Sequence, residues 1–311
     1  MDLWFNTYFE ETPNLNPRLN DWVVNFDIDN LLLDLDIFNN PLDQAIRAVH
    51  EVVGKFDGPY TLLASGGIDS QALIWAWEQS KVPYKIYHYD YNGWNYHDTE
   101  YLIKFLKKHK LEHKLVIKKL DAMSFIASQD LISYAKEYDC SSPQILTYIK
   151  FVEQTPGTVI QSGNYISKYV SGLSYTLMAL QRYAEKRPNY IPFFFQSFPY
   201  LAYSFIRDDY AFNKKPVKAI DVGYSAKCQT YKKTGFPIIE QSEKYTGFEK
   251  IKKFFDSEYV NPQDQIRWAN QPSKRPFDIL FRYKLYDHIG LYNDKTTIKH
   301  HSKVNNLLLG G

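Results

Sequence analysis

The 311-residue chain lacks several features that mark particular classes of protein. It has only two cysteines, Cys140 and Cys228, with no Cys-x-x-Cys spacing, which argues against a disulfide framework and a cysteine-rich zinc site. Its most apolar stretch, residues 191–206, is too short to span a membrane and is interrupted by Pro192 and Pro199. The first residues show no signal-peptide pattern. These absences predict a folded cytoplasmic protein with no membrane partner.

The chain also lacks a strong charge of either sign, since its formal net charge is +2. Basic residues occur in local clusters such as 107–110 and 299–303, which are typical of solvated faces and loop ends. The many tyrosine and phenylalanine side chains suit base stacking, but an AT-rich coding sequence would enrich them as well. A nucleic-acid partner therefore stays open and is not favoured.

Hydrophobic patterning divides the chain into three regions. Residues 1–39 mix acidic and apolar positions in near alternation, which predicts an extension packing on the next unit. Residues 40–180 alternate between short apolar runs and amphipathic stretches. Residues 181–311 are rich in aromatic side chains and punctuated by proline, with the clearest helix at 247–259. We expect an α/β domain followed by a mostly helical, aromatic-rich substrate region.

The central region has clear helix and strand signals. Asn40 and Pro41 suit a helix start, and Gly54 suits its end. Further helices are expected at 71–81, 98–110 and 121–154 (the last broken near its middle), and strands at 59–65, 84–91, 114–120 and 158–163. Strands separated by helices of this length predict an α/β fold, a parallel sheet with helices on both faces.

Residues 65–70 read SGGIDS and form the turn between a predicted buried strand and the next helix. In a parallel sheet such a turn lies at the carboxyl edge, where helix N–H groups and the helix dipole favour an anion. Gly66 and Gly67 allow a tight bend and a close approach to a ligand, and Ser65 and Ser70 add hydroxyl groups. The turn is not a Walker A loop, because it carries Asp69 and no lysine. A carboxylate beside phosphates suits Mg²⁺.

At these residues the chain resembles the PP-loop ATP pyrophosphatase superfamily, whose signature is SGGxDS. The resemblance implies an adenine nucleotide α-hydrolase fold that cleaves ATP between its α and β phosphates, with Mg²⁺ as the metal. It assigns Asp69 to the metal and to catalysis. It assigns the pyrophosphate to a loop of six residues: Ser65, Gly66, Gly67, Ile68, Asp69 and Ser70.

Within that superfamily, residues 40–175 look most like the synthetase domain of asparagine synthetase. A second motif in that family has the form SGEGADE and follows a later strand. Ser162 and Gly163 match its first two residues and are the further ATP-binding candidates, but the acidic pair is missing. The resemblance implies that a carboxylate or carbonyl is adenylated and that a nucleophile then displaces AMP, forming a carbon–nitrogen bond. The expected acceptor is a small molecule or a nucleobase.

In two-domain asparagine synthetases, a cysteine after the initiator methionine hydrolyses glutamine. This chain begins Met1, Asp2, Leu3 and has too few residues before the turn for such a domain. We therefore expect nitrogen to come from free ammonia, an amine on the substrate or a separate ammonia-supplying subunit.

Other candidates follow from position alone. His88 ends the second strand, where family members bind adenosine, although a strand end that packs its own aromatics is an equal alternative. Lys168 and Lys244 are the catalytic candidates for steadying phosphates, and Lys232 and Lys233 are also considered. Each of these lysines has an alternative interpretation as an ordinary surface lysine.

Two other functions stay open. Cys140 and Cys228 resemble the cysteine pair of tRNA-thiolating PP-loop enzymes, although buried cysteines are usually unreactive. A nucleotide-binding module without catalysis is the other alternative, because the second motif lacks its acidic pair. Gly310 and Gly311 resemble a ubiquitin-like tail but are interpreted as a frayed end.

Overall fold

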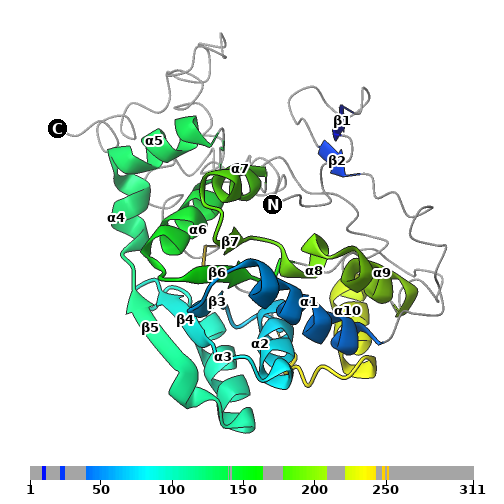
Figure 1. The fold of residues 1–311 in the computed structure, drawn as a ribbon. Helices are drawn as coiled ribbons and strands as arrows, with labels where there is room; N and C mark the ends of the chain where they lie inside the picture. The colour runs from blue at the N-terminus through cyan, green and yellow to red at the C-terminus, as the bar shows by residue number, and fades with distance from the viewer. Residues whose placement is uncertain are drawn as a thin grey trace.

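The structure is a computed structural model, and its core is a parallel sheet covered by helices on both faces (Figure 1). The expected α/β fold is therefore confirmed. The structure describes residues 9–11, 22–24, 40–138, 140, 142–163, 178–208, 221–242, 247–248 and 251.

The central sheet has five strands in the order β5-β4-β3-β6-β7, all parallel. Their bounds are β3 (Tyr60–Leu63), β4 (Lys85–Asp90), β5 (Leu115–Lys119), β6 (Thr158–Gln161) and β7 (Tyr190–Ile191). In the register, Leu62 pairs with Ile86 on one side and with Ile160 on the other. A separate antiparallel pair joins β1 (Phe9–Glu11) and β2 (Trp22–Val24).

The strand order places a topological switch point at β3. The chain runs outward from β3 through β4 to the edge strand β5, and then returns to place β6 on the other side of β3. The two halves of the sheet are thus wound in opposite directions from β3. Open α/β sheets bind ligands at such a switch point, outside the carboxyl ends of the strands.

The helices agree with the predicted pattern and refine its limits. Their bounds are α1 (Pro41–Lys55), α2 (Ile68–Ser80), α3 (Tyr96–His109), α4 (Ala122–Ala127), α5 (Gln129–Glu137), α6 (Pro143–Gln154), α7 (Met178–Lys186), α8 (Phe194–Ser197), α9 (Pro199–Asp208) and α10 (Asp221–Lys233). Asn40 caps α1 as predicted, because its Oδ1 accepts the Leu42 N–H at 3.0 Å. Helix α2 begins three residues before the predicted start, so the end of SGGIDS forms its first turn.

Alternate strand residues point into two cores. Leu62 and Ile160 pack with α1, α2, α3 and the helices α8 to α10, whereas Leu63 and Val159 pack with α4 to α7. Side chains alternate across a strand, so these cores lie on opposite faces of the sheet. Figure 1 shows α1, α2 and α10 on one side of the strands and α4 to α7 on the other.

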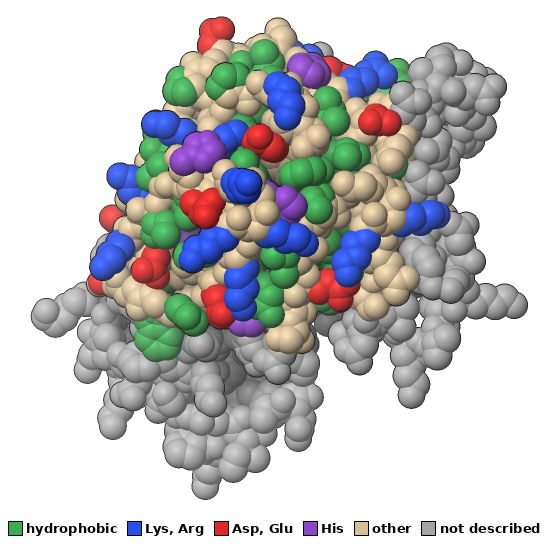
Figure 2. Space-filling model, turned by 90° about the horizontal axis from the view of Figure 1, so that it is seen from below, with side chains coloured by type: hydrophobic (Ala, Val, Ile, Leu, Met, Phe, Trp, Pro, Cys, Tyr) green, Lys and Arg blue, Asp and Glu red, His purple; other side chains and the backbone are tan. Residues whose placement is uncertain are grey.

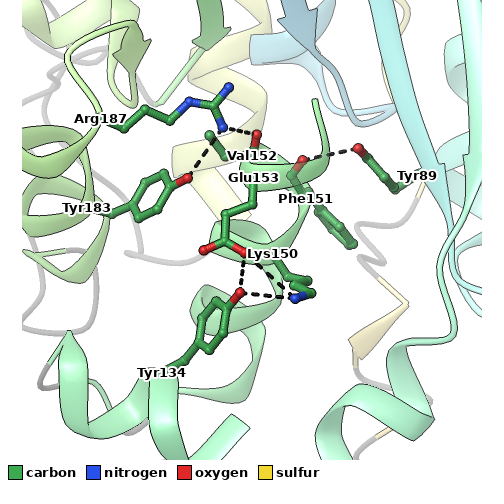
Figure 3. A network of polar contacts seen from close by, with 8 residues as sticks. All are labelled: Tyr89, Tyr134, Lys150, Phe151, Val152, Glu153, Tyr183 and Arg187. Atoms are coloured by element: carbon green, nitrogen blue, oxygen red, sulfur yellow. Dashed lines mark hydrogen bonds and ion pairs between the residues drawn. The ribbon is translucent and has the colours of Figure 1, made fainter. Parts of the chain in front are cut away.

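A polar network ties α5, α6 and α7 together around the second core (Figure 3). Arg187 donates to the carbonyl of Val152 and, at 2.8 Å, to the carbonyl of Thr155, so it holds the carboxyl end of α6. The Tyr134 hydroxyl donates to Glu153, and Lys150 donates to the same hydroxyl at 3.1 Å. These contacts fix the helix that leads into β6.

The predicted boundary at residue 180 divides elements that contact each other. Strand β7 lies beyond it and pairs with β6 in the central sheet. Helices α8, α9 and α10 pack into the same core as α1 and α2. The helix expected at 247–259 lies mostly outside the described residues. In the parts of the chain that the structure describes, no helix is both long and apolar enough to cross a membrane.

Candidate functional site

The SGGIDS turn follows β3 at the switch point. Its backbone N–H groups donate hydrogen bonds to the serine hydroxyls of the same turn. The Ser65 N–H donates to Ser70 Oγ at 3.1 Å, and the two hydroxyl oxygens are 3.2 Å apart. The Gly67 N–H donates to Ser65 Oγ at 3.2 Å. Ser65 is exposed and Ser70 is buried, so the pair connects the open side of the turn to its base.

The two glycines of the turn differ in what they require. A Cβ on Gly66 would lie 2.0 Å from the carbonyl oxygen of Asp98, so this glycine is needed for the close packing of the turn on α3. A Cβ on Gly67 would meet nothing nearer than Ser65 Oγ, at 3.3 Å. Of the two glycines, Gly67 is therefore the one whose added Cβ would meet only a side-chain atom and no backbone. Both glycines were expected to let a ligand approach closely. At Gly66 the space that a side chain would need is occupied by the backbone of Asp98.

The amino end of α2 has the features of an anion site. Gly67 is its N-cap residue and, within the described residues, gives no side-chain cap, whereas Asn40 and Ser142 cap α1 and α6. The first N–H groups of a helix have no partner within the helix, and the helix dipole adds partial positive charge there. The N–H groups of this first turn follow directly on the carboxyl end of β3.

Asp69, in that first turn, is held by two side chains of α10. The ammonium of Lys227 lies 2.6 Å from the Asp69 carboxylate, and the Tyr231 hydroxyl donates to Asp69 Oδ1 at 2.6 Å. Neither partner was predicted from the sequence, in which the candidates from this helix were Lys232 and Lys233. Lys232, one of these candidates, is exposed and pairs with Glu240. The four-residue spacing of Lys227 and Tyr231 places both on one face of the helix, but this spacing alone does not point to Asp69.

Gln71 connects the turn to the segment after α10. It is fully buried, and its Nε2 donates to the Gly66 carbonyl at 2.8 Å and to the Ile239 carbonyl at 3.2 Å. Its Oε1 accepts the Ile239 N–H at 2.6 Å. The side chain therefore pairs with Ile239 as a neighbouring strand would. Residues 236–242 are fixed against the base of the turn.

His88 has a supporting position beneath the turn. It is 2% exposed, with Nδ1 2.9 Å from the Ala64 carbonyl and Nε2 2.8 Å from Thr99 Oγ1. Because a carbonyl can only accept, Nδ1 carries the proton of the neutral ring. Burial lowers the pKa of His88, against smaller opposing effects of the Ala64 carbonyl and Asp90. Both ring nitrogens are used within the protein, so the imidazole supports the end of β3.

Ser162 and Gly163, the remaining ATP-binding candidates, follow β6 beside the turn. Ser162 is buried and its carbonyl accepts the Phe195 N–H at 3.1 Å. Gly163 has φ +63°, and a Cβ there would lie 2.9 Å from the Cα of Phe193. Both the conformation and the contact favour glycine. Lys168 and Lys244 lie outside the described residues, as do residues 164–167 and Gly310 and Gly311.

The two cysteines are not a pair. Cys140 belongs to the core beneath α4 to α7, and Cys228 to the core on the opposite face of the sheet. Both are buried, and burial raises the pKa of the Cys228 thiol to about 11. A protonated, enclosed thiol is a poor nucleophile at neutral pH. The arrangement gives no support to chemistry that needs two neighbouring cysteines.

The site suits a metal that arrives with phosphates. Among the described residues, no group of three or more His, Cys, Asp or Glu side chains is placed to hold an ion. Asp69 already binds a cationic group, the Lys227 ammonium, so its carboxylate is placed to accept a cation. Mg²⁺ commonly binds through one or two carboxylates, with water and substrate phosphates completing its shell. Asp69 fits that requirement.

On the face seen in Figure 2, charged side chains of both signs are mixed. Figure 2 shows one face of the molecule with lysine, arginine, aspartate, glutamate and histidine side chains interspersed. Within single helices, Lys104 pairs with Glu100 at 2.7 Å and Lys150 with Glu153 at 3.7 Å. Such mixing is typical of a solvated surface.

Neither a protein-family model nor a curated protein sequence matches the chain.

Proposed function

We propose that the protein binds Mg·ATP at the SGGIDS turn and cleaves it between the α and β phosphates, transferring AMP to a carboxylate or carbonyl oxygen of an acceptor. A nucleophile then displaces AMP to form a new bond, most simply carbon–nitrogen. The observation that carries the proposal is the location of SGGIDS. It forms the turn after β3, beside the switch point of the sheet, and leads into a helix without a side-chain cap.

Four residues of the turn and one of α10 have named roles in this proposal. The N–H groups of α2's first turn and the hydroxyls of Ser65 and Ser70 bind the pyrophosphate as it leaves. Gly67 leaves room for it. Asp69 holds Mg²⁺, which neutralises charge on the phosphates. Lys227, which reaches Asp69 at 2.6 Å, steadies the same phosphates, a role that was expected, from the sequence alone, of Lys168 or Lys244.

Two other features support an acceptor bound near the turn. Residues 236–242, tied to the turn through Gln71, come from the aromatic C-terminal region. The carboxyl end of β6, with Ser162 and Gly163, borders the turn on its other side through the pairing of β3 with β6. We expect the acceptor to be a small molecule or nucleobase, with ammonia, an amine on the substrate or a separate subunit supplying nitrogen.

Pyrophosphate exchange tests the proposal before the final nucleophile is known. The protein is incubated with Mg·ATP, labelled pyrophosphate and a panel of amino acids, other carboxylic acids and nucleobases. Adenylation is reversible, so the true acceptor causes label to enter ATP, and Asp69→Asn abolishes the exchange. Nucleotide binding without exchange for any acceptor would favour a non-catalytic nucleotide-binding module.

A further inference from the structure

The Asp69 carboxylate is already neutralised by the protein itself. Lys227 and Tyr231 both contact it at 2.6 Å. Side-chain exposure is 16% for Asp69 and 19% for Lys227, so water screens this ion pair little. A charge-assisted hydrogen bond of this kind is stronger than a neutral one.

The geometry of this contact is fixed by the core behind it. Tyr231 is fully buried among Phe195, Phe205 and Phe236, with ring centroids 6.0, 5.6 and 5.3 Å away. Its ring cannot move without repacking these aromatics, so its hydroxyl stays directed at Asp69. Lys227 lies one helical turn earlier, on the same face of α10. The helix therefore presents the ammonium and the hydroxyl to the carboxylate together.

A free divalent cation meets an unfavourable site here. It would have to displace the Lys227 ammonium, and among the described residues no cluster of three metal-ligating side chains would compensate. A nucleotide changes this balance, because its phosphates attract both the metal and the ammonium. Lys227 has a long flexible stem and can turn from a carboxylate to nearby phosphate oxygens.

We propose that the site accepts its metal only as a metal–nucleotide complex, and that Lys227 is a placeholder cation that leaves Asp69 for the phosphates when the complex binds. This movement of Lys227 breaks no covalent bond, and its ammonium group stays protonated. Tyr231 stays on Asp69 Oδ1 and orients the carboxylate, so it is a positioning residue. This inference rests on the proposed function, because it assumes that a nucleotide binds at this turn.

The test measures how tightly the protein binds a divalent metal ion and does not depend on catalytic turnover. Mn²⁺ binding is followed by electron paramagnetic resonance for the wild type, Lys227→Met and Lys232→Met, each with and without a non-hydrolysable ATP analogue. Lys232 is the matched control, because it lies on the same helix and pairs with Glu240 at the surface. Lys227→Arg keeps the positive charge, and thermal melting confirms that each variant is folded.

Without nucleotide, we expect Lys227→Met to bind Mn²⁺ at least about tenfold more tightly than the wild type, as loss of a charge-assisted partner allows. Lys227→Arg and Lys232→Met should match the wild type. With the analogue, the wild type should bind Mn²⁺ tightly, and Lys227→Met should bind the analogue more weakly. If Lys227→Met and the wild type bind Mn²⁺ equally tightly without nucleotide, Lys227 is not a placeholder cation, even where the analogue binds. Failure of the analogue to bind any protein overturns the proposed function instead.

Discussion

The side-chain amide of Gln71 pairs with both the N–H and the carbonyl of Ile239, a residue 168 positions later in the chain. The same amide also donates to Gly66 in the SGGIDS turn. One buried side chain thus connects the proposed pyrophosphate loop to the C-terminal segment that follows α10. The contact links the nucleotide site to the region expected to bind the acceptor.

We predict that Gln71→Leu loosens this segment. The change leaves the Ile239 N–H and the Gly66 carbonyl without their partner, and unpaired buried polar groups each cost about 1–3 kcal/mol. Unfolding in urea should show a loss of about 2 kcal/mol, and hydrogen exchange at residues 236–242 should accelerate. Gln44→Leu is the matched control, because Gln44 is also buried but its Oε1 has no hydrogen-bond partner among the residues that the structure describes. Equal effects of the two variants would contradict a linking role for Gln71.

The two glycines of the turn should separate folding from binding. Gly66→Ala places a methyl group 2.0 Å from the Asp98 carbonyl, so it should destabilise the protein by about 3 kcal/mol. Gly67→Ala has an allowed backbone conformation, with φ −66° and ψ 155°, and should change stability by less than about 1 kcal/mol. It should nevertheless weaken ATP binding by about tenfold, because its methyl group narrows the side open to phosphate. Thermal melting and nucleotide titration measure the two effects. Full ATP affinity in Gly67→Ala would mean that phosphates do not approach this residue.

His88 should make stability depend on pH. Its pKa is lowered in the folded state by burial, so between that value and about 6.5 the unfolded chain binds more protons than the folded one. Stability is therefore fully present above about pH 6.5 and falls as the pH drops below it. His88→Gln removes this dependence. The melting temperature measured near pH 7.5 and near pH 5.5 should differ more in the wild type than in the variant; equal differences would contradict the assignment.

Cys228 should react slowly with alkylating reagents in the native protein. Burial raises the pKa of its thiol to about 11, so little thiolate exists at neutral pH. Iodoacetamide labelling, read by mass spectrometry, should stay slow near pH 8 and rise toward pH 11, whereas the unfolded chain should label quickly. Fast native labelling at neutral pH would reopen the thiolation alternative.

Local patterns predicted much of the architecture. Asn40 and Pro41 predicted the start of α1, because capping is a local interaction. The alternation of apolar runs with amphipathic stretches predicted the parallel sheet. The SGGIDS turn could be located because its residues are contiguous. Lys227 could not be chosen over its neighbours, since its importance comes from a contact 158 positions away in the chain. Likewise, the demand on Gly66 comes from the Asp98 backbone, which the sequence around the turn does not reveal.

The central claim is that ATP is cleaved between its α and β phosphates at the SGGIDS turn. ATP labelled at the α phosphate, incubated with the protein, Mg²⁺ and the acceptor found by exchange, tests it most directly. The account predicts that the label appears in AMP, or in an adenylate that yields AMP, in equal amounts with pyrophosphate. Asp69→Asn should form neither, while Lys232→Met behaves as the wild type. Label recovered in ADP, with release of phosphate, would contradict the account.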